Sequence, residues 1–340
     1  MDQATGKLKQ KAIELGFDLA GVAMLGRSDG VERLRPWLES GKNAGMSYMS
    51  ERLDAYEDPN LVLDGVRCIL MLGTAYHTLE PAQPGSDEGC ISRYAWGTDY
   101  HDLIRKRLKT LSAYHRELFP NGHSRGVVDT APILERHFAK KAGLGWIGKN
   151  NLLINDRFGS WIFLSGLLST EPLTPDEPGP DQKCGSCQAC LNACPTGALV
   201  APCSLDACRC LSYWLVESRG PIPLELRSLV DNRLFGCDTC QAVCPANREA
   251  QKSREKEFFP RPGQYQVPLL DILEITEEQF NKRFAGTPIK RIGREGLLRN
   301  AAIVAGNRPT PSLKEALIEL LNNPSETVRD AAAWALERFK

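Results

Sequence analysis

The sequence lacks the long apolar segments that place a protein in a membrane. A membrane helix needs roughly 18 consecutive apolar residues, whereas the longest apolar runs, at 68–76 and 161–168, are only long enough for strands. The N-terminus carries no hydrophobic stretch of the signal-peptide type. We therefore expect a cytoplasmic protein that does not contact membranes.

The sequence also lacks net charge, because 42 Lys and Arg residues balance 42 Asp and Glu residues. Neutrality excludes a chain that is basic throughout, but it does not exclude a local basic patch. Apolar residues make up 42% of the 340 residues, which is ordinary for a folded protein and argues against disorder. At roughly 150 residues per domain, the length predicts about two domains.

Residues 1–172 have the pattern of a domain that mixes strands and helices. The apolar spacing predicts strands at 19–23, 66–72, 126–129, 151–155 and 160–168, and helices at 7–15, 103–118 and 133–142. No Gly-x-Gly-x-x-Gly motif follows any of these strands. A dinucleotide-binding site therefore has little support.

Two further segments follow this domain. Residues 171–183 contain four prolines and four acids, which predicts a linker at the end of the first domain. A cysteine-rich segment at 173–250 and a tail at 251–340 come next. In the tail, helices are predicted at 295–304, 312–321 and 325–339, a pattern similar to a HEAT-type helical repeat.

Cysteine is the unusually frequent residue, and ten of the twelve cysteines fall within residues 184–244. The first arm, Cys184-x2-Cys187-x2-Cys190-x3-Cys194-Pro195, has the spacing of a bacterial ferredoxin. In that spacing three thiolates bind one 4Fe–4S cluster and the fourth binds a second cluster. The remaining two cysteines lie outside this segment, one in an apolar strand and one without a partner at ligand spacing.

A second arm, Cys237-x2-Cys240-x3-Cys244-Pro245, ends in the same way but lacks one leading cysteine. Because each cluster needs four ligands, a cysteine outside the arms must complete the set. The crossed pattern predicts one set of Cys184, Cys187, Cys190 and Cys244, and a second of Cys194, Cys237, Cys240 and one of Cys203, Cys208 or Cys210. Zinc held by four cysteines is the alternative, but two x3-Cys-Pro ends favour clusters.

Asp129 is a candidate proton donor, because it ends an apolar strand shortly before Pro132. A carboxyl group in apolar surroundings has a raised pKa and can act as an acid near neutral pH. Alternatively, Asp129 caps the helix predicted to begin near Pro132, and the residues by themselves favour the cap. The loop at 143–150, with three glycines and the pair Lys149-Asn150, predicts close approach of the backbone to a ligand.

These motifs resemble those of the epoxyqueuosine reductase family, whose members act in queuosine synthesis on tRNA. The resemblance extends over nearly the whole chain. It rests on the first cysteine arm and on residues 93–101, 129–150, 210–213, 236–241 and 296–302. Ala246 replaces the family's usual Trp after the second arm, which should alter packing near Cys244 rather than chemistry.

The resemblance implies an α+β fold in three parts. These are a nitroreductase-like cobalamin-binding domain over 1–172, a ferredoxin-type domain with two 4Fe–4S clusters over 173–250, and a linker with a HEAT-like helical tail over 251–340. The implied reaction removes the epoxide oxygen of epoxyqueuosine in tRNA, the last step of queuosine synthesis. An external low-potential donor would supply the electrons, and we expect a monomer.

The resemblance also implies roles for single residues. Asp129 matches the family's catalytic acid, which reverses the preference for a cap. Cys210 matches the family's eighth cluster ligand and leaves Cys203 and Cys208 as spare thiols. Cobalamin contacts are expected at Arg52, Tyr100, Asp129, Asn155 and Ser212, with core and turn roles as the alternative for Tyr100 and Asn155. No Asp-x-His-x-x-Gly motif is present, so cobalt is expected to have no histidine ligand from the protein.

A basic segment at 282–299 is the predicted tRNA contact. It has six basic residues against one acid, Glu295, a balance of plus five. The basic residues are Lys282, Arg283, Lys290, Arg291, Arg294 and Arg299. Phosphate contacts would make binding depend strongly on salt. The alternative is a charged face that only contacts solvent.

Two other functions fit parts of the sequence. A cobalamin-dependent reductive dehalogenase would share the cofactors, but it would usually be exported and would not need a basic helical tail. An electron-transfer or scaffold protein would carry the clusters without cobalamin. The absorption spectrum of the protein supplied with cobalamin would separate this last function from the two enzymes.

Overall fold

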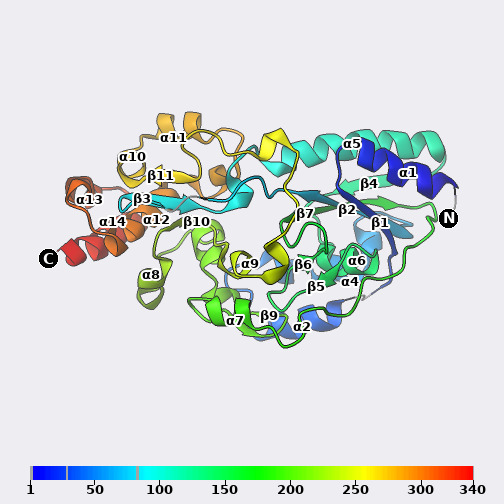
Figure 1. Ribbon diagram of the computed structural model, residues 1–340, viewed down its shortest axis with the longest axis horizontal. Coiled ribbons are helices and arrows are strands. Elements are labelled where there is room, and N and C mark those ends of the chain that lie inside the picture. Colours follow the sequence, from blue (N-terminus) through cyan, green and yellow to red (C-terminus); the bar gives the residue numbers. More distant parts are fainter. Residues whose placement is uncertain (1–2, 28–29, 82–83, 340) are drawn as a thin grey trace.

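A four-stranded antiparallel sheet forms the centre of the N-terminal half. In the computed structural model of the protein, which describes residues 3–27, 30–81 and 84–339, the strand order is β1-β2-β7-β4 (Figure 1). The strands are β1 (Leu19–Met24), β2 (Cys68–Ala75), β4 (Ser124–Val127) and β7 (Ile162–Ser169). Each overlaps a strand that the apolar runs predicted.

Helices cover both faces of this sheet, and β2 is therefore buried at every position. Successive side chains of a strand point to opposite faces. Leu70 shares a core with α1 (Gln3–Glu14) and α5 (Tyr100–Leu118), whereas Ile69 shares one with α6 (Glu135–Lys141). Smaller elements flank the sheet: α2 (Val31–Glu39), α3 (Tyr48–Glu51), α4 (Leu53–Glu57), β5 (Trp146–Ile147) and β6 (Leu153–Ile154).

A second sheet takes its three strands from distant parts of the chain. β3 (Glu88–Ile91) lies between β10 (Arg233–Phe235), to which it is parallel, and β11 (Gln266–Pro268), to which it is antiparallel. One strand comes from each of the three predicted segments. Ile91 accordingly shares one hydrophobic core with residues of the cysteine-rich segment and of the tail.

The cysteine-rich segment consists of short elements joined by loops. The predicted linker at 171–183 contains neither helix nor strand. Asp176 ties this linker to the first sheet, because its carboxylate accepts hydrogen bonds from Lys9 Nζ and the backbone N–H of Val22, each at 2.6 Å. The elements that follow are α7 (Ala189–Ala193), β8 (Leu199–Ala201), β9 (Ser204–Leu205), a π-helix (Tyr213–Glu217), α8 (Leu224–Val230) and α9 (Thr239–Ala242).

The tail is helical, as predicted, and lies at the opposite end of the molecule from α1 (Figure 1). Its helices are α10 (Leu269–Leu273), α11 (Glu277–Arg283), α12 (Gly293–Asn307), α13 (Lys314–Leu320) and α14 (Glu326–Leu336). α12 is buried on all sides over residues 296–306 because α10, α14 and the second sheet pack around it. Among the described residues, no helix is long and apolar enough to cross a membrane.

Candidate functional site

The first cysteine arm borders a cavity of about 100 Å³. The cysteines that line it are Cys184, Cys187, Cys190 and Cys244, the set predicted for the first cluster. Burial raises the pKa of Cys190 and of Cys244, and the charges of other members of the set raise both values further. This coupling requires the thiol groups to lie close together. Ala246 also lines the cavity, beside Cys244.

The second set gathers around α9, which packs on α7. Burial raises the pKa of Cys210, and the charges of Cys237 and Cys194 raise it further. Burial likewise raises the pKa of Cys240, followed by the charges of Cys237 and Cys210. Cys190 of the first set acts on Cys240 as well, so the two sets adjoin there.

The spare thiols have other partners. Cys203 Sγ donates to the carbonyl oxygen of Gly148 at 3.4 Å, and Cys203 lies near Cys184 of the first set. Cys208 is exposed, and its Sγ donates to the carbonyl oxygen of Gly41 at 3.4 Å. The structure therefore places Cys210, rather than Cys203 or Cys208, with the second set.

The glycine-rich loop at 143–150 holds both cysteine arms. Lys149 Nζ donates to the carbonyl oxygens of Gly185 at 2.7 Å and Cys187 at 2.9 Å, and Asn150 Nδ2 donates to that of Cys240 at 3.5 Å. Lys149 is 9% exposed and lines the first cavity. Its ammonium group is therefore a positive charge beside the first set, a role that the sequence motif did not specify.

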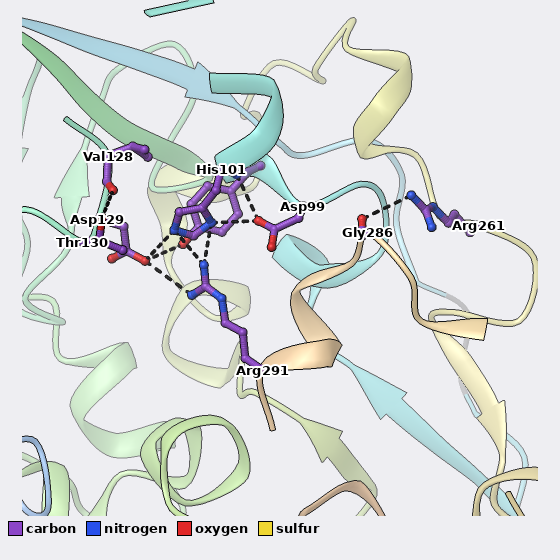
Figure 2. A network of polar contacts seen from close by, with 9 residues as sticks. Asp99, His101, Val128, Asp129, Thr130, Arg261, Gly286 and Arg291 are labelled. Atoms are coloured by element: carbon purple, nitrogen blue, oxygen red, sulfur yellow. Dashed lines mark hydrogen bonds and ion pairs between the residues drawn. The ribbon is translucent and has the colours of Figure 1, made fainter. Parts of the chain in front are cut away.

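Asp129 lies in a strained turn after β4 (Figure 2). Its φ is 56°, and the N–H of Thr130 donates to the carbonyl oxygen of Val128 at 2.5 Å, which closes a three-residue turn. Strain of this kind is concentrated at functional sites. α6 begins only at Glu135, with Leu134 as its N-cap, so the alternative prediction that Asp129 caps this helix is wrong.

Two residues in the first turn of α5 bind the Asp129 carboxylate (Figure 2). Tyr100 donates its hydroxyl hydrogen to Asp129 Oδ2 at 2.9 Å, and His101 Nε2 lies 3.1 Å from the same oxygen. His101 Nδ1 lies 2.8 Å from Asp99 Oδ1. Because carboxylates only accept hydrogen bonds, these contacts favour a hydrogen on both ring nitrogens of His101.

Burial lowers the pKa of His101, but its hydrogen bonds with Asp129 and Asp99 outweigh burial and raise the pKa above its usual value. For Asp129 the opposite holds. Burial raises its pKa, but hydrogen bonds from His101 and Tyr100 and the nearby Arg291 charge lower it to about 2. The expectation of a raised pKa at Asp129 is therefore wrong, because polar groups from other elements surround this carboxyl group.

Arg291, one of the predicted tRNA contacts, reaches this carboxylate from the tail (Figure 2). Its Nη1 lies 3.5 Å from Asp129 Oδ2. Its Nη2 lies 2.5 and 2.7 Å from Nδ1 and Nε2 of His101, and its guanidinium lies 5.7 Å from the centre of the Tyr100 ring. Arg291 thus connects the predicted RNA surface with the predicted acid.

Arg52, one of the predicted cobalamin contacts, lies beside Asp129, whereas Ser212 comes from the cysteine-rich segment. Arg52 Nη1 donates to the carbonyl oxygen of Thr130 at 3.1 Å. Ser212 precedes the π-helix and makes no capping hydrogen bond with its side chain. Partial burial and the charges of Glu217 and Asp129 raise the pKa of Tyr48 to about 12, so Tyr48 lies near both the end of the π-helix and Asp129.

Tyr100 and Asn155, two further predicted cobalamin contacts, also make contacts within the protein. The Tyr100 ring stacks on Phe163 with 4.1 Å between ring centres, and its hydroxyl binds Asp129. Asn155 Nδ2 donates to the carbonyl oxygen of Leu144 at 2.7 Å, and Asn155 Oδ1 accepts from the N–H of Arg157 at 2.9 Å. Asn155 therefore holds a turn.

Glu135 is a second carboxyl group in this site. Its Oε1 is buried and has no hydrogen-bond partner. Burial, and next the charge of Asp129, raise the pKa of Glu135 to about 8. Of the two carboxyl groups in the site, Glu135 therefore takes up a proton at a higher pH than Asp129.

The remaining basic residues of the segment 282–299 differ in how far they are buried. Lys282 and Lys290 are exposed, whereas Arg283 lies 3.2 Å from Asp271 and Arg294 donates to the carbonyl oxygen of Ile275 at 2.7 Å. Arg299 is fully buried. It donates to the carbonyl oxygens of Gly220 at 2.6 Å, Trp214 at 2.7 Å and Ser218 at 3.0 Å. The prediction that Arg299 contacts tRNA is therefore wrong, because α12 is buried on all sides.

His101 is one of three residues in this network that the sequence did not reveal as such. It stood within the motif at 93–101, but only its contacts with Asp99 and Asp129 reveal a role. Glu135 and the site position of Arg291 were missed for the same reason. Their roles depend on neighbours that are distant along the chain and on burial that arises only when the chain folds.

Paired cysteine sets and a proton-holding network together define an iron–sulfur oxidoreductase. The family described as "4Fe-4S double cluster binding domain" matches residues 183–247, and the family described as "Epoxyqueuosine reductase QueG, DUF1730" matches residues 57–130.

Full-length comparisons identify the family. The chain is 41% identical to the epoxyqueuosine reductase of Pseudomonas aeruginosa, over 97% of this chain and 93% of that protein. It is 38% identical to that of Escherichia coli K12, over 99% and 89%. A crystal structure of epoxyqueuosine reductase with an epoxyqueuosine-modified tRNA stem loop superimposes with a TM-score of 0.93, at 31% identity over 99% of this chain and 90% of that one. The chain belongs to the epoxyqueuosine reductase family.

Proposed function

We propose that the protein reduces epoxyqueuosine in tRNA to queuosine. The observation that carries this proposal is the match to epoxyqueuosine reductases along nearly the whole chain. The reaction removes the epoxide oxygen as water and leaves an alkene. It therefore consumes two electrons and two protons, and the site must supply both.

The two cysteine sets hold the two 4Fe–4S clusters and carry the electrons. The first set borders the cavity beside Lys149. The second set includes Cys210, close to the π-helix that faces Tyr48 and Asp129. Electrons from an external low-potential donor enter at the first cluster, pass where Cys190 and Cys240 adjoin, and leave from the second cluster.

Cobalamin is the cofactor proposed for the space between the π-helix and Asp129. Arg52 and the Ser212 hydroxyl provide hydrogen-bonding groups that fit the amide side chains of a corrin ring. His101 is occupied by Asp99 and Asp129, which suits a cobalt without a histidine ligand from this site. Bound there, cobalamin would supply a reduced cobalt that transfers electrons to the substrate. Tyr100, Asp129 and Asn155 are the further residues proposed to contact the cofactor.

Asp129 delivers a proton to the departing oxygen, and His101 holds the proton behind it. The Asp129 side chain, which belongs to the strained turn, is 50% exposed and can therefore be reached from solvent. His101, at 3% exposure, is shielded from solvent. General acid catalysis of this kind accelerates a reaction by about 10² to 10⁴-fold.

The tail binds the RNA. Lys282 and Lys290 are exposed, Arg283 and Arg294 are partly exposed, and Arg291 reaches Asp129. These are the basic residues proposed to meet the RNA. We assign residues 1–172 to cobalamin and catalysis, 173–250 to the clusters and 251–340 to RNA binding, in a monomeric protein of the cytoplasm.

Mass analysis of tRNA nucleosides tests the proposal directly. A strain that lacks the gene should accumulate epoxyqueuosine, and a plasmid carrying the wild-type gene should restore queuosine. Normal queuosine in the deletion strain would refute the proposed function.

A further inference from the structure

The contact between Arg291 and His101 places a guanidinium against a ring that becomes positively charged when it is protonated. Arg291 Nη2 lies within 2.7 Å of both ring nitrogens of His101. A guanidinium can only donate hydrogen bonds, and both ring nitrogens already face carboxylate oxygens of Asp99 and Asp129. The Arg291 charge therefore opposes full protonation of His101, and it also favours the ionised form of Asp129.

The backbone around Arg291 is fixed while its side chain reaches solvent. The carbonyl oxygen of Gly286 accepts from the N–H of Asp99 at 2.8 Å and from Arg261 Nη2 at 3.3 Å, which ties this segment to the start of α5 (Figure 2). The Arg291 side chain is 35% exposed. Its guanidinium can thus leave His101 without movement of the segment.

The exposed lysines nearby make this position one that RNA reaches. Lys290 precedes Arg291 in the chain, and Lys282 lies at the end of α11. Phosphate binds guanidinium groups through paired, charge-assisted hydrogen bonds. A phosphate on this surface would therefore be a stronger partner for Arg291 than Asp129 at 3.5 Å.

We propose that Arg291 couples RNA binding to proton uptake: a phosphate of the bound RNA withdraws its guanidinium, and the His101–Asp129 pair takes up a proton from solvent. This inference rests on the proposed function. Arg291 acts through the pair and is a positioning residue. Removing a positive charge raises the pKa of both members, so the direction of proton movement is fixed.

Other groups that face the pair keep their places in this step. They come from α3, α4, α5, α6, the π-helix and the loop before α5, and they are Tyr48, Arg52, Tyr56, Tyr94, Asp99, Tyr100, Glu135 and Glu217. Arg52 is the other cation among them, and it is bound to the backbone of Thr130. Arg291 is therefore the group whose removal changes the charge at the pair.

Isothermal titration calorimetry of the holoprotein with an unmodified anticodon stem-loop RNA measures this uptake without any reaction. Titrations in buffers of different protonation enthalpy give the number of protons bound with the RNA. We expect the wild type to take up a fraction of a proton at about pH 7.5, and almost none at about pH 5, where His101 is already protonated.

Three variants separate the coupling through Arg291 from a simple loss of positive charge. Arg291→Gln should bind RNA more weakly and take up almost no proton, and Arg291→Lys should restore part of the uptake. Lys282→Gln, which removes a charge from the same surface, should weaken binding but leave the proton count unchanged.

Two results would overturn the inference. These are RNA binding by the wild type without proton uptake, or an Arg291→Gln variant that takes up as many protons as the wild type. Either would leave the proposed function intact. A wild-type protein that does not bind the RNA at all would count against the proposed function and would remove the inference with it.

Discussion

The cysteine sets and the Asp129 network balance their charges in different ways. Among the cysteines of the two sets, burial raises the pKa of Cys190, Cys210, Cys240 and Cys244, and neighbouring cysteines raise it further. Burial also raises the pKa of Cys194, but hydrogen bonds from Thr196 and the backbone outweigh it and lower the value. Around Asp129, the protein itself supplies the balancing charges, from His101 and Arg291. Most thiolates of the cysteine sets would thus gain from the positive charge that iron supplies, whereas the Asp129 carboxylate has its balancing charges within the protein.

This difference matches the two kinds of charge that the reaction needs. Electrons pass between fixed clusters, so their ligands can be held by short local segments. A proton must leave its holder, so its site needs partners that can separate, as Arg291 can from His101. The predictions below test this division in order of decreasing effect.

The largest effect is expected for Cys210→Ala. Loss of this ligand should remove one cluster, so that iron falls from about eight to about four atoms per chain, and turnover should fall to background. Iron analysis and single-turnover assays check this. Cys208→Ala, a change of the exposed thiol two residues earlier, should keep both iron and turnover. The ligand assignment fails if the two variants exchange these results.

Asp129→Asn should lower turnover by about 10² to 10⁴-fold while the cluster and cobalamin spectra stay unchanged. Asn tolerates the positive φ of 56°, so the variant removes the acid without straining the turn. Asp231→Asn is the matched control, since Asp231 also has a positive φ, 54°, but lies at the end of α8. Near-normal turnover in Asp129→Asn would contradict its role as proton donor.

The rate at saturating RNA should fall as the pH rises. His101 is the proton holder below its pKa, which its hydrogen bonds raise above 6.5. Above that pKa the protonated fraction, and with it the rate, should fall about tenfold per pH unit. His101→Gln should lack this decline. A decline that persists in the variant and is centred near pH 8 would instead assign the proton to Glu135, whose pKa is raised to about 8.

The smallest effects should separate the two kinds of basic residue in the tail. Arg299→Gln leaves buried carbonyl groups without donors, at about 1–3 kcal/mol each, and should lower the thermal unfolding midpoint by several degrees. Lys282→Gln should keep that midpoint and weaken RNA binding a few-fold, with a smaller salt dependence. Thermal melts and salt-dependent titrations check the pair. Equal midpoints for both variants would contradict the buried role of Arg299.

The sequence predicted the parts of the site that are encoded by local spacing. The two cysteine arms and the main strands and helices belong to this group. The eighth ligand could not be chosen by spacing, because Cys203, Cys208 and Cys210 all lie between the two arms. Only the resemblance favoured Cys210, and the charge coupling places it beside Cys237 and Cys194.

The Asp129 network could not be predicted because its members meet only through tertiary packing. His101 and Asp129 are 28 residues apart, and Arg291 and Asp129 are 162 apart. Counting charges also misled, because Arg299 adds to the basic segment but points into the core. Burial on all sides of α12 depends on what packs around it, which no local pattern records.

The position of β3 between β10 and β11 has a consequence for biosynthesis. β3 is synthesised early, whereas β10 follows the first cysteine arm and β11 follows both arms. Until then its backbone edges are unpaired, and exposed edges invite wrong pairing. The second sheet can therefore be completed only after both cysteine arms have been synthesised.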